Sequence, residues 1–498
     1  MDIIKIGFVF LISFFVSNIK AQSYTLETIN QNNQRNCQLL GQLDSSISFA
    51  VQTNSIIPTS KANWKKPSVK LLPFVVTQQF NSHHPFGWND GAMIQAKGYQ
   101  VLARPGVNAK LGIFETQIAP EFVFATNGNY PTNAQYGNPN NKSFSKVFLG
   151  QSFAKLNLGP ISIGASSENL WWGPGINSSL LMSNNAPGFL HAFIKTNKPI
   201  KTPVGNIEFN LIGARLGSNN ALSYENNQLL PQSINDDWRY LNSYAISFQP
   251  KWVKGLFVGI TRSLQQYGDQ AFKIKGGLFS KYIPVLGLAV QKANNLGDDT
   301  LNRDQLASFF IRWAFPKSQF EFYLEYGYND YGLNIRDYLL APSHSAAYTI
   351  GARKQIKKSN SKYIQLESEI TQMSQSPDYL VRDASNWYEH GQIFQGYTNY
   401  NQTMGSGAGF GANVQTVSAT MINGQVRNGF LIQRIEHDPI NKVNKWTDLG
   451  IGWMPQRTYK NMILGAKLQC IYSKNYAWEK GNNPINLHAR LMIQYNFK

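Results

Sequence analysis

The last fourteen residues of the chain, Ile485 to Lys498, read INLHARLMIQYNFK. Apolar or aromatic side chains occupy every second position: Ile485, Leu487, Ala489, Leu491, Ile493, Tyr495 and Phe497. This period of two is typical of a β-strand with one apolar face and one polar face. A strand of about a dozen residues exceeds the usual globular length of about 5–6. It matches a tilted crossing of a bilayer, which takes about 9–11 residues.

The same alternation recurs along the chain from about Gln95, for example over Phe309–Phe315, Phe320–Tyr328 and Met462–Leu468. The sequence contains no amphipathic helices that could cover so many apolar strand faces. A closed barrel with lipid outside and a polar lumen solves this problem, because closure pairs every backbone group. The polar faces carry mixed charges that can pair across a filled interior. We therefore predict an all-β fold, a closed antiparallel transmembrane β-barrel of about 18 strands with a largely plugged lumen. A large soluble β-protein is the alternative.

Composition excludes two other classes of protein. The chain has 498 residues, of which 13% are aromatic, and Lys+Arg 46 against Asp+Glu 28 gives a net charge of +18. Beyond the first twenty positions no apolar run reaches the length of about 20 residues that a membrane-spanning helix needs. Aromatic and β-branched residues are too frequent for a disordered chain. A disulfide between Cys37 and Cys470 is left open.

The chain begins with the pattern of a secretory signal peptide. Lys5 precedes an apolar stretch from Ile6 to Val16, and the small residue Ala21 follows. We predict a signal peptide over residues 1–21, a short periplasmic segment over residues 22–60 and an outer-membrane barrel over residues 61–498. The final Tyr495-Asn496-Phe497 is typical of outer-membrane barrels, which end on an aromatic strand. We expect the outer membrane of a Gram-negative bacterium.

Short segments with Pro, Gly or Ser separate pairs of expected strands, and we predict them as periplasmic turns. They are residues 104–106, 158–160, 202–205, 249–251, 283–284, 316–318, 358–360 and 455–457. Two long segments, residues 165–188 and 374–413, are then expected to be outer loops.

These segments carry motifs that resemble the Wzi capsule-assembly family. The matching stretches are Leu39-Leu40-Gly41-Gln42-Leu43-Asp44, Gly87-Trp88-Asn89-Asp90-Gly91, Pro120-Glu121, Trp171-Trp172-Gly173-Pro174-Gly175 with Asn184-Asn185-Ala186-Pro187, and Gly396-Tyr397-Thr398-Asn399. The resemblance implies an eighteen-stranded outer-membrane barrel that acts as a lectin for capsular polysaccharide and has no catalytic activity. Family members from enteric bacteria carry a periplasmic helical bundle, whereas residues 22–59 here are short and polar.

The two long segments also have the chemistry of a sugar-binding site. Sugar rings stack on aromatic faces, while amides and carboxylates bond to their hydroxyl groups. The predicted ligand-binding residues are Glu168, Trp171, Trp172, Asn184, Asn185, Tyr397, Asn399 and Gln402. For Trp171 and Trp172 the alternative is that they plug the barrel or belong to an aromatic girdle.

Other functions are weighed on the same residues. The pair Glu389-His390 does not make a hydrolase, because neighbours on a strand point to opposite faces and no Gly-x-Ser-x-Gly elbow is present. We predict no enzyme, no metal and no cofactor; an acidic loop with Asp298, Asp299 and Asp304 is read as a solvated loop rather than a calcium site. The open alternatives are a diffusion channel and a non-catalytic partner barrel in a surface-assembly or secretion complex.

The expected partners follow from charge and location. The net positive charge suits lipopolysaccharide phosphates or an acidic capsule, although much of it is also explained by solvated loop lysines. Nucleic acid is not expected, because the chain is exported and has no compact basic motif. We expect a monomer that contacts outer-membrane lipids, lipopolysaccharide and a capsular or other surface polysaccharide.

Overall fold

The computed structural model describes residues 26–43, 45–53, 67–132, 142–217, 238–271, 282–286, 303–329, 342–359, 361–375, 386–391, 393–440 and 442–497. The predicted signal peptide lies outside these residues, as do Asp298 and Asp299. Within the described residues, no helix is both long enough and apolar enough to cross a membrane.

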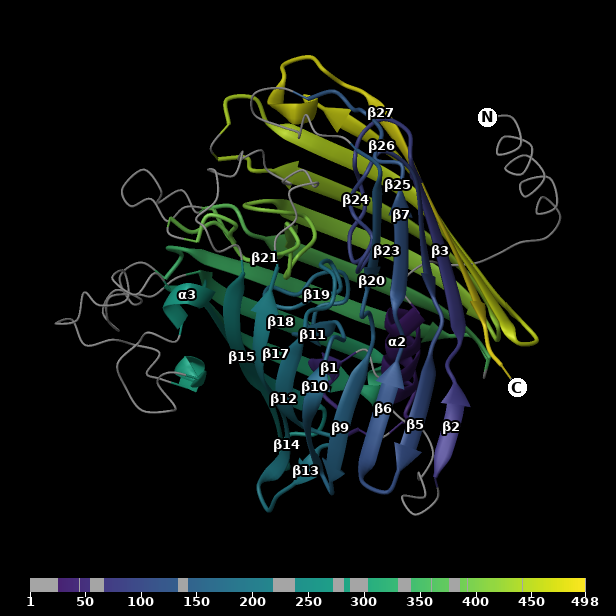
Figure 1. Ribbon diagram of the computed structural model, residues 1–498. Coiled ribbons are helices and arrows are strands. Elements are labelled where there is room, and N and C mark those ends of the chain that lie inside the picture. Colours follow the sequence, from purple (N-terminus) through teal and green to yellow (C-terminus); the bar gives the residue numbers. More distant parts are fainter. Residues whose placement is uncertain are drawn as a thin grey trace.

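Strands dominate the described chain (Figure 1). In the N-terminal part they are β1 (Val51–Thr53), β2 (Ser68–Leu71), β3 (Phe74–Asn81), β4 (Gly98–Arg104), β5 (Val107–Leu111), β6 (Phe114–Ile118), β7 (Glu121–Ala125), β8 (Phe144–Phe148), β9 (Phe153–Leu158), β10 (Ile161–Ser166), β11 (Leu170–Trp172), β12 (His191–Thr196), β13 (Ile200–Lys201) and β14 (Gly205–Leu216). In the C-terminal part they are β15 (Arg239–Pro250), β16 (Leu256–Tyr267), β17 (Arg303–Phe315), β18 (Phe320–Asn329), β19 (Ala346–Lys357), β20 (Lys362–Gln372), β21 (Thr398–Asn399), β22 (Gln402–Thr403), β23 (Asn413–Asn423), β24 (Val426–His437), β25 (Trp446–Tyr459), β26 (Met462–Lys474) and β27 (Ile485–Tyr495).

Among the described residues the helical elements are few. They are α2 (Leu26–Leu39), α3 (Gly268–Ala271) and the 3₁₀ turns η1 (Pro284–Leu286), η3 (Pro316–Ser318) and η5 (Tyr476–Trp478). The all-β expectation therefore holds for the wall of the molecule, whereas the fourteen-residue helix α2 was not anticipated.

The wall is one antiparallel ring of strands. Strand β27 pairs with β26 on one side and with β3 on the other, so the pairing closes on itself. Along β27 the side chains alternate as expected: Leu487 and Leu491 are 54% and 47% exposed, while Asn486 and His488 are buried. The outward face of the ring is apolar and its inward face is polar.

Several wall strands are interrupted without changing direction. Strands β2 and β3, β4 and β5, β6 and β7, β8 and β9, and β12 and β13 lie end to end along shared neighbours. Four of the five breaks contain a proline, at Pro73, Pro105, Pro120 and Pro199, because proline has no N–H to continue a ladder; the β8–β9 break over residues 149–152 contains none. The backbone bond from Leu72 N–H to Gly106 O, 2.8 Å, bridges one break.

Two predicted turns are corrected by this pairing. Residues 104–106 interrupt one continuing strand, and Pro455 lies inside β25, where its register partner is Asn428. Both prolines disturb the hydrogen-bond ladder but do not reverse the chain. Residues 283–284 belong to the long connection that contains η1. The predictions at residues 158–160, 202–205, 249–251, 316–318 and 358–360 are confirmed as short connections between paired strands, with residue 360 outside the described part.

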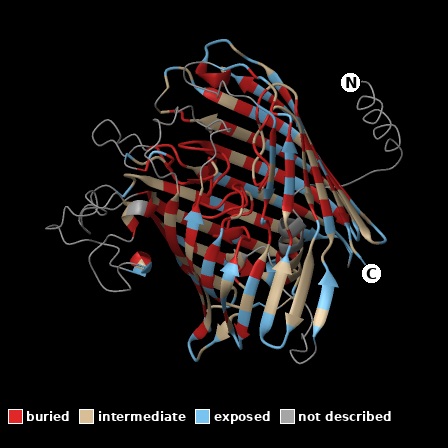
Figure 2. Cartoon of the chain, in the orientation of Figure 1, coloured by how far each residue is buried: buried red, intermediate tan, exposed pale blue. Residues whose placement is uncertain are grey.

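The two ends of the ring differ in the length of their connections. At one end, here called the short-turn end, the strands are joined by turns such as η3. At the other, the loop end, lie the long segments that include residues 167–190 and 373–412. Their described residues are mostly buried, and Figure 2 shows them as red traces within the ring. The long segments therefore fold into the barrel rather than away from it.

Helix α2 also lies within the ring (Figure 1). The Nε of Arg35 donates to Glu321 Oε1 of β18 at 2.8 Å, and Arg353 Nη1 of β19 donates to Asn36 Oδ1 at 3.0 Å. The domain boundaries at residues 21/22 and 60/61 stay predictions. Cys37 on α2 and the exposed Cys470 on β26 are both free thiols, so no disulfide joins them.

Candidate functional site

The segment around Trp171 is held inside the barrel by a wall carboxylate. Glu369 of β20 accepts hydrogen bonds from the backbone N–H groups of Ile176, Asn177 and Ser178 at 2.6, 3.1 and 2.8 Å. The hydroxyl of Tyr323 donates to the same carboxylate at 2.7 Å. Charge-assisted bonds of this kind are about twice as strong as neutral ones. Glu369 thus fixes the turn that follows the two tryptophans.

A second wall carboxylate fixes the same segment. Glu325 of β18 accepts the N–H of Leu180 at 3.2 Å and the hydroxyl of Ser308 at 2.8 Å. Gly173 packs against this carboxylate with φ +130°, and a Cβ there would stand 2.6 Å from Glu325 Oε2. Only glycine suits such a position, which explains the Trp-Trp-Gly sequence. Trp171 and Trp172 are 5% and 0% exposed, which matches the alternative that they fill the barrel.

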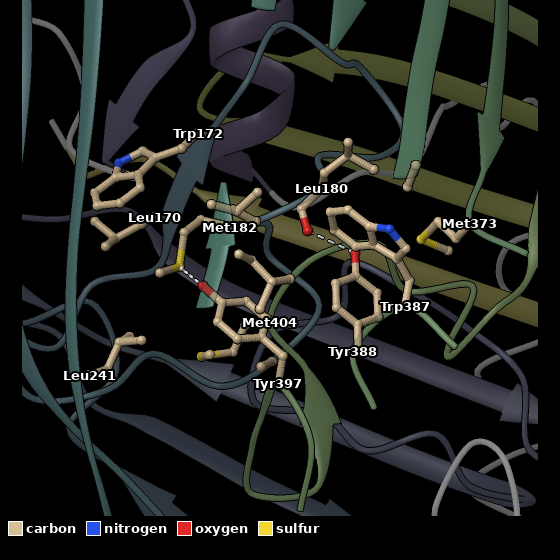
Figure 3. Close-up of a cluster of buried hydrophobic side chains, with 14 of the residues drawn as sticks. Leu170, Trp172, Leu180, Met182, Leu241, Met373, Trp387, Tyr388, Tyr397 and Met404 are labelled. Atoms are coloured by element: carbon tan, nitrogen blue, oxygen red, sulfur yellow. Dashed lines mark hydrogen bonds between the residues drawn. The ribbon is translucent and has the colours of Figure 1, made fainter. Parts of the chain in front are cut away.

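The second long segment packs on the first (Figure 3). Tyr397 is fully buried, its hydroxyl donates to Ser263 Oγ at 2.8 Å, and burial raises the pKa of this phenol well above its usual value. The hydroxyl of the neighbouring Tyr388 donates to Leu180 O at 2.8 Å. Arg239 of the wall donates to Gly396 O at 2.6 Å and to Thr398 O at 2.8 Å.

The predicted amide groups are used within the protein. Asn399 donates to Pro187 O and accepts from the Gly217 N–H, both at 3.0 Å. Asn185 donates to Thr403 O at 3.0 Å and accepts the Asn89 N–H at 3.2 Å. These bonds join segments that lie far apart in the sequence.

All eight predicted ligand-binding residues are thus brought together inside the ring. Each is at most 5% exposed, including Glu168, whose carboxylate lies 3.9 Å from Lys195 Nζ, and Gln402. Tyr400, at the tip of the β21–β22 hairpin, is half-buried, and the ammonium of Lys146 stands 3.7 Å from its ring centre. These segments belong to the loop end of the ring, wall residues bond them inward, and their place on the outer side of the membrane stays a prediction. Whether any of the eight touches sugar stays a prediction.

A pocket at the loop end combines aromatic and polar side chains, which is the composition expected of a sugar-binding site. Its cavity volume is about 40 Å³, and it is partly open to solvent. Its lining includes the aromatic residues Phe86, Trp88 and Trp446, with the polar Gln95, His437 and Asp448. Aromatic faces beside a few convergent polar groups define the usual ligand site.

The polar side of the pocket is pre-ordered. Asp448 accepts Trp446 Nε1–H at 2.7 Å and lies 2.9 Å from His437 Nε2. The rings of His437 and Trp446 stack with centroids 3.9 Å apart. Gln95 donates to Gly87 O at 2.6 Å, and its Oε1 accepts no hydrogen bond from the residues that the structure describes. One carboxylate therefore orients both rings.

A layer of packed rings supports the pocket from behind. His84 is 1% exposed, and its ring lies 4.5 Å from that of Tyr476 and 6.4 Å from that of Trp446. Burial lowers the pKa of His84 to about 4, so the ring is neutral at pH 7.

The sequence pattern alone does not indicate this pocket as a site. Trp88 is part of one of the family motifs quoted above. No sequence motif indicated that His437, Trp446 or Asp448 belong to a site. Their relation appears only when β24 and β25 pair, because His437 and Trp446 are register partners. The one available signal was an aromatic residue inside the Gly-Trp-Asn-Asp-Gly motif.

The ring, its apolar outward face and its inwardly folded loops define a class of protein: an outer-membrane β-barrel whose interior is filled by its own segments. The particular family follows from sequence. The model of the family "Capsule assembly protein Wzi" matches residues 76–466, most of the chain, so the chain belongs to this family.

The chain is also similar to solved structures. The chain is similar to Wzi of Escherichia coli, described as an outer-membrane protein involved in group 1 capsule assembly and a carbohydrate-binding β-barrel: the identity is 13%, the TM-score 0.58, and 85% of this chain and 84% of that chain are covered. It is also similar to OccAB3 of Acinetobacter baumannii, at 9% identity and TM-score 0.46 over 86% of this chain and 99% of that chain. OccK5 of Pseudomonas aeruginosa matches at 8% identity and TM-score 0.42 over 87% and 99%. No curated protein matches the chain in sequence.

Family and fold together identify the chain as an outer-membrane protein of a Gram-negative bacterium, as predicted.

Proposed function

We propose that this chain is a non-catalytic lectin that holds a capsular or other surface polysaccharide on the outer surface of the cell. One observation carries the proposal: at the loop end an open pocket combines the rings of Phe86, Trp88 and Trp446 with the polar groups of Gln95, His437 and Asp448. The carbohydrate binding described for the Escherichia coli protein supports it. Trp446 is 2% exposed, so a pyranose ring would stack on the partly exposed rings of Phe86 and Trp88 while its hydroxyl groups bond to the polar side.

In this proposal the eight buried residues support the loops that line the pocket and do not contact the sugar themselves. Gly407 lines the pocket, and a Cβ at this glycine would stand 2.3 Å from Asn185 Oδ1 and 2.4 Å from Trp88 Cβ. Asn185 in turn bonds to Thr403 and Asn89. Residues such as Asn185, Asn399 and Tyr397 thus support the loops that shape the pocket, in place of the direct sugar contact expected from sequence.

The proposal includes an eighteen-stranded barrel with a plugged lumen. Within the described residues, twenty-three strands form the ring, and five end-to-end pairs reduce them to eighteen crossing segments. The inward loops and α2 occupy the lumen through wall residues such as Glu369, Glu325 and Glu321. A filled lumen favours binding over diffusion, and we place lipopolysaccharide and membrane lipids around a monomeric barrel.

The test is binding of capsular polysaccharide, purified from the source bacterium, to the full chain in detergent by titration calorimetry. Trp88→Ala removes one half-exposed ring and should weaken binding by about 1–2 kcal/mol, or roughly five- to thirtyfold. The matched control is Trp252→Ala, which removes a ring that is 70% exposed at the short-turn end.

Equal affinities of the two variants would remove the pocket from the proposal. In cells, deletion of the gene should shift polysaccharide from the attached to the shed fraction without changing total synthesis. A large steady single-channel conductance of the purified chain, with attachment unchanged in the deletion strain, would instead support the diffusion channel.

A further inference from the structure

The short-turn end carries a group of exposed lysines on four neighbouring connections. They lie at or beside the links β13–β14, β15–β16, β17–β18 and β19–β20. This lysine collar consists of Lys201, Lys251, Lys254, Lys317, Lys358 and Lys362, all exposed. Six cations on one rim form a strong positive field.

The carboxylates near this end do not neutralise the collar. Glu321 and Glu367 pair with Arg312 and Arg353 of the inner wall at 2.6 Å each. Glu208 accepts the N–H of Ser48 inside the ring at 2.8 Å. Across the described ranges, no ion pair joins a collar lysine to a carboxylate of the chain. Among the described residues, the collar is therefore a charged surface without a paired carboxylate.

Aromatic side chains lie among these lysines on the outward face. Trp252 stands between Lys251 and Lys254 and is 70% exposed. Beside Lys317, the rings of Trp313 and Phe315 stack with centroids 5.0 Å apart, and Trp313 is 38% exposed. Exposed Trp and Tyr residues mark the boundary between the apolar layer and the headgroups in membrane proteins. Lysines at the same level reach the phosphates of the lipids with their long side chains.

We propose that the lysine collar binds the phosphate headgroups of anionic phospholipids in the periplasmic leaflet of the outer membrane. Short turns of such barrels face the periplasm, so the lipids at this rim are phospholipids rather than lipopolysaccharide. The aromatic residues beside the lysines continue the apolar outward face of the wall, which a membrane covers, so we assign this surface to a membrane and not to a soluble acidic protein. This function is independent of polysaccharide binding at the opposite end.

The test reconstitutes the full chain in phosphatidylcholine vesicles and measures quenching of its tryptophan fluorescence by brominated lipids. Brominated phosphatidylglycerol should quench more than brominated phosphatidylcholine, with a relative affinity of about threefold or more, and 0.5 M salt should reduce this preference. The variant Lys251→Gln/Lys254→Gln/Lys317→Gln should lower the ratio to near one.

The control variant is Lys142→Gln/Lys474→Gln/Lys480→Gln, which removes three exposed lysines at the loop end and should keep the preference. Equal quenching by the two lipids in the unmodified chain, or an unchanged ratio in the collar variant, would overturn the proposal. Binding of soluble poly-glutamate to the collar without any lipid preference would assign the surface to an acidic polypeptide and also overturn it. Polysaccharide affinity of the collar variant should equal that of the unmodified chain, so a failure here leaves the lectin proposal standing.

Discussion

Two regions of the barrel interior use similar polar residues in opposite ways. Where the first long segment meets β18 and β20, Glu325 and Glu369 accept backbone N–H groups at 2.6–3.2 Å, and these bonds hold the segment to the wall. At the loop end of β24 and β25, Asp448 orients two rings, while the half-exposed Trp88 and Gln95 keep surface available. The first region, whose wall carboxylates are hydrogen-bonded within the protein, fills the barrel. The second region keeps aromatic and amide groups partly exposed, so a ligand can bind there.

The largest effect should come from removing a saturated carboxylate. Glu369→Ala leaves three buried N–H groups and the Tyr323 hydroxyl without an acceptor, which should lower the free energy of unfolding by about 3–5 kcal/mol. Thermal unfolding in detergent, followed by tryptophan fluorescence, measures this. The control Glu436→Ala breaks a pair with the 40%-exposed Arg434 and should cost less than about 1 kcal/mol. Similar losses in both variants would mean that Glu369 does not hold the plug.

The next largest effect is expected from lowering the pH, which should reduce the stability that depends on His84 behind the pocket. The unfolded chain protonates His84 near pH 6.5, whereas burial lowers the pKa in the folded chain to about 4. Between these values the unfolded state binds more protons, so the stability present above pH 6.5 is lost as the pH falls towards 4, by up to about 3 kcal/mol. Unfolding measured from pH 7 to pH 4 should show this slope in the unmodified chain and a shallower one in His84→Phe. Parallel curves would exclude His84 as the source.

A smaller change tests how the plug shapes the pocket. Gly407→Ala forces Asn185 or Trp88 to shift, and we expect polysaccharide affinity to fall about tenfold while the barrel still assembles. The matched control is Gly391→Ala, because a Cβ there would meet nothing within 4 Å. An unchanged affinity in the Gly407 variant would mean that Trp88 is not part of the binding surface.

The smallest effect is expected from removing a single hydroxyl group from the hydrogen-bonded segments inside the barrel. Tyr397→Phe deletes the bond to Ser263 Oγ and should cost about 1 kcal/mol of stability, with no change in polysaccharide affinity. Titration calorimetry beside a thermal melt separates the two quantities. Weakened binding at unchanged stability would restore Tyr397 as a direct sugar contact, as the sequence suggested.

The sequence was sufficient for the wall of the molecule. The alternation in residues such as Leu487 and His488 depends only on which face meets lipid, so a period of two predicts it. Proline was less informative: Pro316 opens a turn, whereas Pro105 and Pro455 stand within continuing strands, and neighbouring residues do not distinguish these cases.

The position of the loops could not be predicted, because their partners are remote in the chain. Glu369 bonds to Ser178, 191 residues away, and Asn185 bonds to Thr403, 218 residues away. The same limit hid the pocket, where residues 85–95, 407–408 and 435–448 meet. The residue types indicated a sugar-binding site, but its position becomes apparent only in the folded ring.

The contacts of helix α2 also have a consequence for the order of assembly. Arg35 meets a carboxylate 286 residues further on, and Asn36 meets a guanidinium 317 residues further on. Contacts this distant form only after a large loss of chain entropy, so they form late. The helix leaves the ribosome before any wall strand, yet its binding surface exists only once β18 and β19 have paired. We therefore expect it to dock after the middle of the wall has formed, because its salt bridge to Glu321 and its hydrogen bond with Arg353 require that these strands are paired in register.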